Sequence, residues 1–253
     1  MSAFASDFAV SPRLVAVPRK RPSVALLQRV PMFARLNDAT LHRLCAIAEI
    51  TDAPDGAVLC REGDQADSLQ LLIEGQVTLR AGAADGRSAV VEVVRPVRHL
   101  VLASVLARLP YAITATAISV CSLVTIGATP LLALLHDDSD LANVLMLAQA
   151  LDFRAMVREV CDLKLRTAAE RLGCYLLELS QDQAGRHSTH LRLPIGKQLL
   201  AARIGCRHEN LSRAFASLRE MGVETHGKRV ILHDIPRLRQ FAFPDYTTEP
   251  KPA

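Results

Sequence analysis

Long apolar runs are missing from this 253-residue sequence. The longest candidate, residues 100–126, is interrupted by Arg108 and Pro110, so no segment reaches the roughly 18 apolar residues that suggest a membrane helix. A secretory leader is not expected either, because Arg13, Arg19 and Lys20 fall where its apolar core would lie. The sequence therefore predicts a cytoplasmic protein with no membrane partner.

Motifs for metal binding and catalysis are also missing. The six cysteines form no CxxC pair, which excludes a cysteine-ligated zinc or iron–sulfur site at recognisable spacing, and no bound metal is expected. The sequence has no nucleophile elbow, P-loop, dinucleotide fingerprint or HExxH motif. Half of the residues are apolar and only 22% are charged, which predicts folded domains. We therefore expect a globular protein that is not an enzyme.

Charge is spread unevenly along the chain. Residues 186–240 contain 11 Lys/Arg against 4 Asp/Glu, a formal charge of +7, whereas the whole chain carries +4. The rest of the chain is therefore mildly acidic. A basic C-terminal third on such a protein favours a polyanionic partner that binds this third alone.

The pattern along the chain divides it into five segments. Residues 1–25 predict a flexible arm and residues 246–253 a flexible tail. Residues 26–136 predict an antiparallel β-roll, because short apolar stretches alternate there with Gly-containing turns. These stretches are residues 58–60, 69–73, 77–79, 90–94 and 122–126. Residues 137–164 predict one long helix that opens on an acidic first turn, and residues 165–245 form the last domain.

The long helix carries a narrow apolar stripe. Its members recur at alternating spacings of three and four residues, as in the seam between two helices of a coiled coil. They are Leu141, Val144, Ala148, Leu151 and Ala155. The core helix of a monomer could show the same spacing, but a narrow seam with small alanines favours contact between two chains. We therefore predict a homodimer through this helix.

Residues 193–222 predict two helices joined by a tight turn. The first helix covers residues 196–203 and ends at Gly205, which can adopt the positive φ that such a turn needs. The second covers about residues 207–221, with Gly222 just after its end. A hairpin follows, with strands at 223–225 and 230–232 around the turn Gly227-Lys228, and Asp234 caps a last short helix. This order is typical of a winged helix-turn-helix.

The second of these helices has two distinct faces. Its apolar face consists of Leu211, Ala214, Phe215 and Leu218. Glu209, Ser212 and Arg213 lie on the opposite face, near the end that a recognition helix inserts into the major groove. Arginine can donate two hydrogen bonds to guanine, and glutamate can accept one from cytosine. An alternative is a simple ion pair between Glu209 and Arg213 on a solvated surface. We predict that these three residues read bases. Further contacts to DNA are expected from His208, Arg207, Lys228 and Arg229, with Lys228 on a phosphate.

These residues resemble those of the Crp/Fnr superfamily of bacterial transcription regulators. The resemblance spans about residues 30–240 and rests on Gly56, Gly63 and Gly75, on the long helix, and on one highly specific string. That string is Leu200-Ala201-x-x-Ile204-Gly205-Cys206-x-x-Glu209-x-x-Ser212-Arg213. It departs from the usual family pattern in having His208 in place of Arg, and Arg207 in place of a capping Ser or Thr.

The resemblance implies an α+β protein with a cyclic-nucleotide-binding-like β-roll sensor domain, a dimerisation helix and a winged helix-turn-helix. It further implies a homodimer on palindromic operators with a TTG…CAA-type core, with double-stranded DNA and RNA polymerase as partners. The alternative is a ligand-sensing β-roll that signals through protein contacts and no longer binds DNA. The intact face of Glu209, Ser212 and Arg213 argues against that alternative.

The expected effector region, residues 95–117, lacks the groups that bind a cyclic nucleotide. Relatives that bind one use a Gly-Glu pair and a downstream Arg, but no Glu lies between Glu92 and Glu159, and Arg108 is the one poorly supported candidate. We therefore expect no binding of cyclic AMP. Oxygen-sensing relatives need an N-terminal cysteine cluster, whereas no cysteine precedes Cys45, so an iron–sulfur cluster is not expected.

Residues 95–117 resemble instead the corresponding segment of denitrification regulators in this superfamily. That resemblance implies a response to nitric oxide, with haem as the candidate cofactor. Haem requires an apolar pocket and an axial His or Cys. The leading candidate is His99, beside the apolar residues 100–106, and weaker ones are His42, Cys121 and His136. The alternative is a pocket that is filled by its own side chains and binds no ligand.

Overall fold

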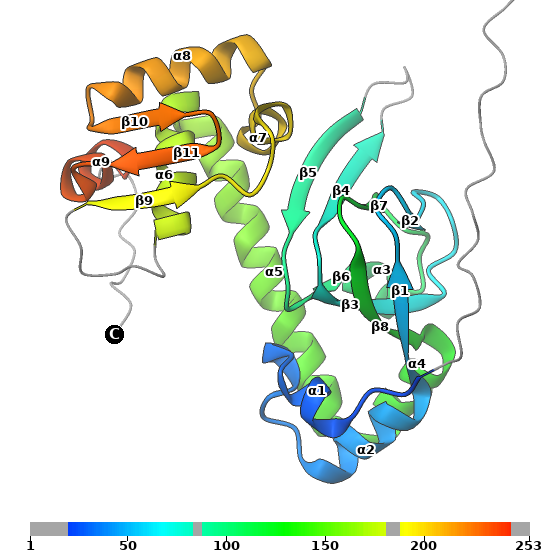
Figure 1. The fold of residues 1–253 in the computed structure, drawn as a ribbon. Coiled ribbons are helices and arrows are strands. Elements are labelled where there is room, and N and C mark those ends of the chain that lie inside the picture. Colours follow the sequence, from blue (N-terminus) through cyan, green and yellow to red (C-terminus); the bar gives the residue numbers. More distant parts are fainter. Residues whose placement is uncertain (1–19, 83–87, 181–187, 244–253) are drawn as a thin grey trace, which may run out of the picture. The chain divides into compact units, whose positions relative to one another are not determined.

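The computed structural model describes residues 20–82, 88–180 and 188–243, and the chain divides into two compact units. The N-terminal unit ends at Phe153 and the C-terminal unit begins at Arg154, both within one helix (Figure 1). Residues 1–19 of the predicted arm and the whole predicted tail lie outside the described residues. The end of the arm was predicted wrongly, because the Ile50 N–H donates to the Lys20 carbonyl at 2.7 Å and Ser23 caps the first helix.

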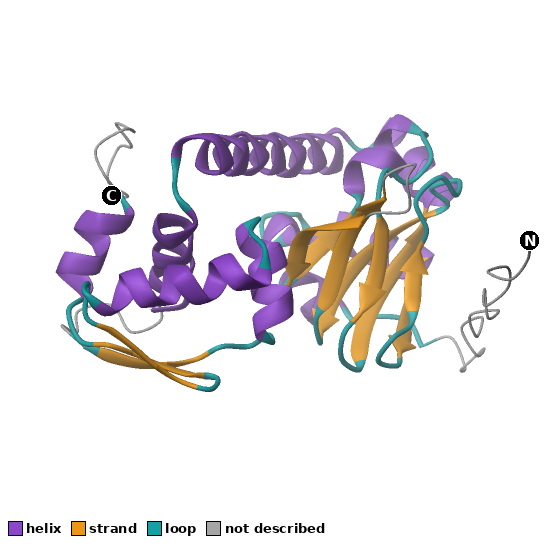
Figure 2. Ribbon diagram, turned by 90° about the horizontal axis from the view of Figure 1, so that it is seen from above, coloured by secondary structure: helices purple, strands orange, loops and turns teal. Residues whose placement is uncertain are grey.

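The N-terminal unit consists of two antiparallel sheets and several short helices. The first sheet has the strand order β1-β8-β3-β6 and the second the order β2-β7-β4-β5 (Figures 1 and 2). The strands are β1 (Ala48–Ala53), β2 (Val58–Cys60), β3 (Ser68–Glu74), β4 (Val77–Gly82), β5 (Ser88–Val94), β6 (Arg98–Leu100), β7 (Thr114–Ala117) and β8 (Cys121–Gly127). The predicted antiparallel β-roll is therefore confirmed, although β1, β6 and β7 were not predicted.

Strand β3 lies at the centre of the first sheet, between β8 and β6. Its five central residues, 69–73, are all buried, so the apolar run in the sequence is continuous and does not alternate. The one polar member, Gln70, donates from Nε2 to the carbonyl of Leu59 at 3.2 Å. This bond links the first sheet to β2 of the second and satisfies a backbone acceptor in the core.

The helices of this unit are α1 (Val24–Gln28), η1 (Pro31–Phe33), α2 (Asp38–Ile47), α3 (Leu102–Ala107) and α4 (Ala128–Asp137). The sequence pattern did not reveal α1, α3 or α4. Both α1 and α3 have six residues or fewer, which is too short to display a helical period. Their buried members, such as Leu27, Leu102 and Leu131, join the single core cluster of the unit.

The long helix α5 (Ser139–Leu165) begins directly after Asp138, within the acidic segment 137–140 that predicted its start. The Asp138 carboxylate accepts hydrogen bonds from the Leu141 N–H at 3.0 Å and from the Thr40 hydroxyl at 2.6 Å. The two contacts tie the start of α5 to α2. They also hold the pKa of Asp138 below its ordinary value, with the hydrogen bond from Thr40 as the largest cause.

The predicted seam of α5 does not form one free surface. Leu141 and Ala148 are buried in the core of the N-terminal unit, and Val144 packs against that core. Their assignment to a contact between chains was therefore wrong, because a buried intrachain position offers no surface to a partner. Leu151 and Ala155 are exposed. A second stripe at spacings of four and three residues is exposed along the helix: Met146, Ala150, Phe153, Val157 and Val160.

The C-terminal unit contains the end of α5, four further helices and one three-stranded antiparallel sheet of order β10-β11-β9. Its elements are α6 (Ala168–Ser180), β9 (Thr189–Arg192), α7 (Lys197–Ile204), α8 (His208–Arg219), β10 (Val223–His226), β11 (Arg229–Leu232) and α9 (Ile235–Ala242). They confirm the predicted helix-turn-helix, hairpin and last helix, and β9 is an addition. Across the described residues, no helix combines the length and apolarity needed to cross a bilayer.

Candidate nucleic-acid interface

The turn between α7 and α8 depends on Gly205. This residue has φ +68°, a conformation that is costly for residues with a Cβ, and its N–H donates to the Ala202 carbonyl at 3.0 Å. The next N–H, of Cys206, donates to the Ala201 carbonyl at 2.9 Å. A Cβ on Gly205 would lie 2.6 Å from Cδ2 of Leu163. The position thus favours glycine for its backbone conformation, and a Cβ there would also require the end of the Leu163 side chain to move.

Helix α8 buries the face that its sequence pattern predicted. Leu211, Ala214, Phe215 and Leu218 are all buried, at 8% exposure or less. They pack α8 against the helices and the sheet of the C-terminal unit, chiefly α6, α7 and β10. The three predicted base-reading residues, together with Ala216, remain exposed on the other side. The apolar pattern alone therefore fixes the rotation of α8 about its own axis.

The exposed face of α8 leaves its polar side chains available. Among the interactions of the described residues, none joins Glu209 to Arg213, and none engages the Ser212 hydroxyl. The alternative of a surface ion pair between the two charged residues is therefore not observed. A carboxylate, a hydroxyl and a guanidinium thus project from the N-terminal half of one exposed helix, with donors and acceptors suited to base edges.

The first turn of α8 has no side-chain cap. Arg207 occupies the N-cap position with extended backbone angles, and its side chain makes no capping hydrogen bond. The free N–H groups and the positive end of the helix dipole therefore face solvent beside the cationic side chain of Arg207 and the exposed His208. Such an end favours an anion, and a DNA phosphate fits it.

The wing is a sheet with cations on its exposed face. Lys228 and Arg229 follow Gly227, which adopts φ +62° in the hairpin turn. Arg229 lies opposite Arg192 of β9 in the sheet register. Like charges directly opposite each other destabilise a sheet unless an anion neutralises them. Sequence reasoning missed Arg192, because its pairing with β11 depends on a contact between segments more than 30 residues apart.

The wing also carries one engaged carboxylate. Glu224 accepts hydrogen bonds from His226 at 2.7 Å and from His233 at 2.9 Å. The hydrogen bond from His233, followed by that from His226, holds the pKa of Glu224 below its ordinary value. This acid is therefore paired with imidazoles, and Lys228 and Arg229 at the tip stay without an acidic partner among the described residues.

In the N-terminal unit, the side chain of His99 contacts an acidic residue of α5. Its Nε2 lies 2.6 Å from Oδ2 of Asp152 on α5, and its side chain is 11% exposed. Burial acts to raise the pKa of Asp152, but the contacts with His99 and Arg98 outweigh it and leave that pKa below its ordinary value. His99 thus links β6 to α5. The contact occupies Nε2 and leaves Nδ1 as the ring nitrogen that could bind a metal, so His99 as an axial ligand stays a prediction.

The remaining candidates for a haem ligand lie on α2, α4 and β8. His42 and His136 are exposed on α2 and α4, with Nδ1 of His42 at 2.8 Å from the Asp38 carbonyl. Cys121 is buried and its thiol donates to the carbonyls of Gln76 and Ser119, each at 3.3 Å. Arg108, the candidate phosphate partner, is exposed at the end of α3. The assignment of these residues to haem or to a phosphate therefore stays a prediction.

Each of the two units contains a segment that matches a known protein domain family. Residues 51–138 match the cyclic nucleotide-binding domain, and residues 170–241 match the Crp-like helix-turn-helix domain. Together these segments cover more than half of the chain, in the order that the sequence resemblance implied. The chain belongs to the Crp/Fnr family of transcription regulators. Its α8 is therefore the recognition helix of a DNA-binding domain.

Relatives of this Crp/Fnr regulator agree with the assignment. It is 24% identical over 220 residues to the CRP-like cAMP-activated global transcriptional regulator of Mycobacterium tuberculosis, covering 86% of this chain and 98% of the relative. It is 30% identical over 135 residues to the nitrogen fixation regulation protein FixK of Azorhizobium caulinodans, covering 51% and 54%. The structure of FixK2 from Bradyrhizobium japonicum has the same fold, with a TM-score of 0.65, 21% identity and coverage of 77% and 97%.

Proposed function

We propose that this regulator binds palindromic operators with a TTG…CAA-type core as a homodimer and controls transcription there together with RNA polymerase. The observation that carries the proposal is the exposed, unpaired set Glu209, Ser212 and Arg213 on α8. These side chains carry the donors and acceptors that discriminate base pairs in the major groove. The neighbouring cations Arg207, Lys228 and Arg229 supply contacts to phosphates, which add affinity without sequence preference.

The homodimer forms through the second stripe of α5, in our proposal. Met146, Phe153, Val157 and Val160 are 45–65% exposed, although all four are large and apolar. Their spacing of seven, four and three residues places them on one line of the helix, as a two-chain coiled coil requires. Two such helices would bring together two copies of α8, and a twofold dimer reads a palindrome.

A selection from random duplexes tests this function. The full chain is incubated with a pool of random 30-base-pair duplexes, and bound DNA is amplified and sequenced over several rounds. We expect enrichment of an inverted repeat with TTG and CAA half-sites, bound at least a thousandfold more tightly than unselected duplex. A pool that stays random, with equal affinity for all sequences, would contradict the proposal and favour a module that signals through protein contacts.

We also propose that the effector is not a cyclic nucleotide, although the N-terminal unit matches a cyclic nucleotide-binding domain. A buried cyclic phosphate needs paired donors, and burying its charge without them costs several kcal/mol. Arg108 is exposed, and Arg98 is already paired with Glu92 and Asp152. An apolar segment of this kind fits a small neutral effector. A nitric oxide response through haem is the specific case that we propose to test, with His99 as the leading candidate ligand.

Titration calorimetry decides between these effectors. Addition of cyclic AMP up to 1 mM to the full chain should release no binding heat. Micromolar affinity would overturn the proposal and point to Arg108 as the partner of the phosphate, which Arg108→Gln would then test. An absorption spectrum after reconstitution with haem provides the second measurement. A Soret band that moves with nitric oxide would support haem as the cofactor, and His99→Ala should change that band if His99 is the axial ligand.

A further inference from the structure

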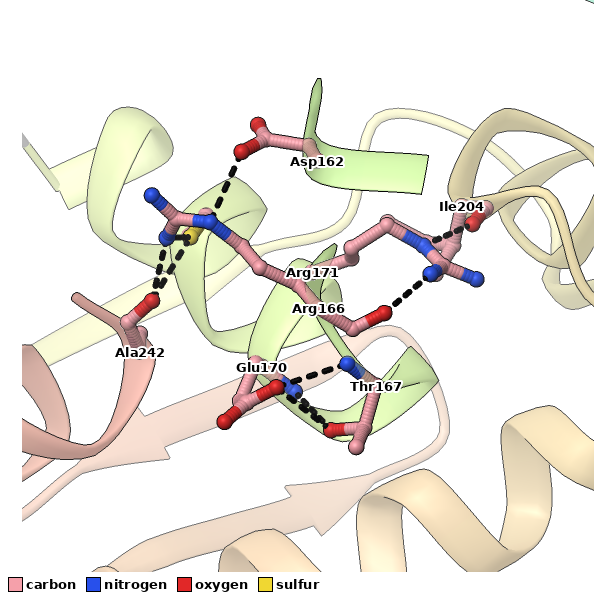
Figure 3. A network of polar contacts seen from close by, with 8 residues as sticks. Asp162, Arg166, Thr167, Glu170, Arg171, Ile204 and Ala242 are labelled. Carbon is pink, nitrogen blue, oxygen red and sulfur yellow. Dashed lines mark hydrogen bonds and ion pairs between the residues drawn. The ribbon is translucent and has the colours of Figure 1, made fainter. Parts of the chain in front are cut away.

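The turn that precedes the recognition helix α8 accepts hydrogen bonds from a side chain of α6. Arg171 on α6 donates from Nε to the Ile204 carbonyl at 2.7 Å (Figure 3), and its Nη2 donates to the Gly205 carbonyl at 3.4 Å. These two carbonyls end α7, where a helix has no backbone donors left to satisfy them. One guanidinium thus replaces the missing donors and fixes the position at which the chain turns toward α8.

Arg171 is itself held in place. A reciprocal capping box starts α6, with the Thr167 N–H donating to Glu170 at 2.6 Å and the Glu170 N–H donating to the Thr167 hydroxyl at 3.3 Å. A third donor of the Arg171 guanidinium, Nη1, binds the Arg166 carbonyl at 2.5 Å at the junction of α5 and α6 (Figure 3). The guanidinium therefore bridges this junction to the turn, and each of its three nitrogens donates one hydrogen bond.

The end of α5 contacts the same region twice. Cδ2 of Leu163 lies against Gly205 so closely that a Cβ there would be 2.6 Å away. About one turn earlier on α5, Glu159 accepts from Arg203 of α7 at 2.8 Å, and both side chains of this pair are partly buried. Side chains from α5 and α6 thus meet the last residues of α7 and the turn after it.

We propose that Arg171, Leu163 and the pair Glu159–Arg203 position the recognition helix, and through it determine how well the regulator distinguishes its operator from other DNA. This inference rests on the proposed function. Only residues 205–207 separate α7 from α8, so a displaced turn displaces the first turn of α8, where Glu209 lies. Base-reading groups tolerate an error of only about 0.5 Å. Arg171, Leu163 and Glu159 are therefore positioning residues, and they act on DNA through α8.

The experiment compares Arg171→Gln with Arg237→Gln, which removes the same charge from an exposed position on α9. Kd values for the selected operator and for a random duplex are measured by fluorescence anisotropy at one salt concentration. Arg171→Gln should reduce the ratio of the two affinities at least tenfold, while its affinity for random duplex equals that of Arg237→Gln. Arg171→Lys, which keeps the charge but loses the fork, should reduce the ratio as well. An unchanged ratio in Arg171→Gln would overturn the proposal.

Two further measurements separate this inference from folding defects and from the proposed function. Glu159→Gln serves as the test if Arg171→Gln does not fold. It removes the charge of Glu159 from the partly exposed pair with Arg203 and should lower the same ratio of affinities. Without DNA, Gly205→Ala should lower the melting temperature strongly, and it should lower it less in a Leu163→Ala background, because the truncated side chain leaves room for the new Cβ. Additive shifts would overturn the contact between Leu163 and the turn. A wild type that shows no operator preference would refute the proposed function, and the melting experiment would still decide this contact.

Discussion

In the C-terminal unit, the sequence pattern placed each core residue of α8 correctly, whereas in the N-terminal unit it missed the helices α1, α3 and α4 and the contact between His99 and Asp152. The difference lies in the range of the interactions that determine each region. Leu211, Ala214 and Leu218 belong to one helix, and their period is visible within 12 residues. The environment of His99 depends on Asp152, which is 53 residues away on another element. Local periodicity predicts the first kind of contact but not the second.

The largest expected effect tests the two stripes of α5 against each other. Val157→Asp places a charge in the exposed stripe and should give a monomer that no longer binds operator DNA, because a buried unpaired charge costs several kcal/mol. Leu151→Asp, on a different face of the same helix, should leave the dimer intact. Analytical ultracentrifugation of both variants measures this. If Val157→Asp stays a dimer and Leu151→Asp becomes a monomer, the interface lies on the stripe that the sequence alone predicted.

The next effect separates the two kinds of DNA contact within the C-terminal unit. Arg213→Ala should weaken binding to the selected operator by about 1–3 kcal/mol and leave binding to random duplex nearly unchanged, because it removes a base contact. Lys228→Ala should weaken both and reduce the dependence of log K on log salt concentration by about 1, because one phosphate is no longer neutralised. Competition titrations at several salt concentrations measure both variants. Equal losses of affinity on both DNAs for Arg213→Ala would show that Arg213 binds phosphate.

A smaller effect is expected at the start of α9. Asp234 accepts from the Arg237 N–H at 2.9 Å, so Asp234→Ala removes this cap and should destabilise the protein by about 0.5–2 kcal/mol. Asp234→Asn retains an acceptor oxygen and should cost less. Thermal unfolding of the two variants at neutral pH provides the comparison. Equal destabilisation by both would mean that the charge, and not the hydrogen bond, stabilises α9.

The smallest effect concerns pH and the N-terminal unit. The pKa of Asp138 is lowered in the folded protein, so its contribution to stability is present at neutral pH and disappears as pH falls through that lowered pKa. Asp138→Asn should therefore lower the melting temperature at pH 7 and change it little at pH 3. A difference from wild type that is the same at both pH values would show that Asp138 stabilises α5 through its hydrogen bonds alone.

The sequence by itself determined the order of the domains, the β-roll, the helix-turn-helix and the exposed face of Glu209, Ser212 and Arg213. In each case neighbouring residues contain the whole pattern: a period of 3.6 residues, a run of buried strand residues, or a glycine at a position of positive φ. Tertiary structure alone decided which stripe of α5 is free along its length, because both stripes have coiled-coil spacing and only packing within the N-terminal unit buries Leu141 and Ala148 of the first stripe. It also decided the hydrogen bond from Arg171 to the Gly205 carbonyl, since these two residues, 34 positions apart, come together only when the C-terminal unit folds.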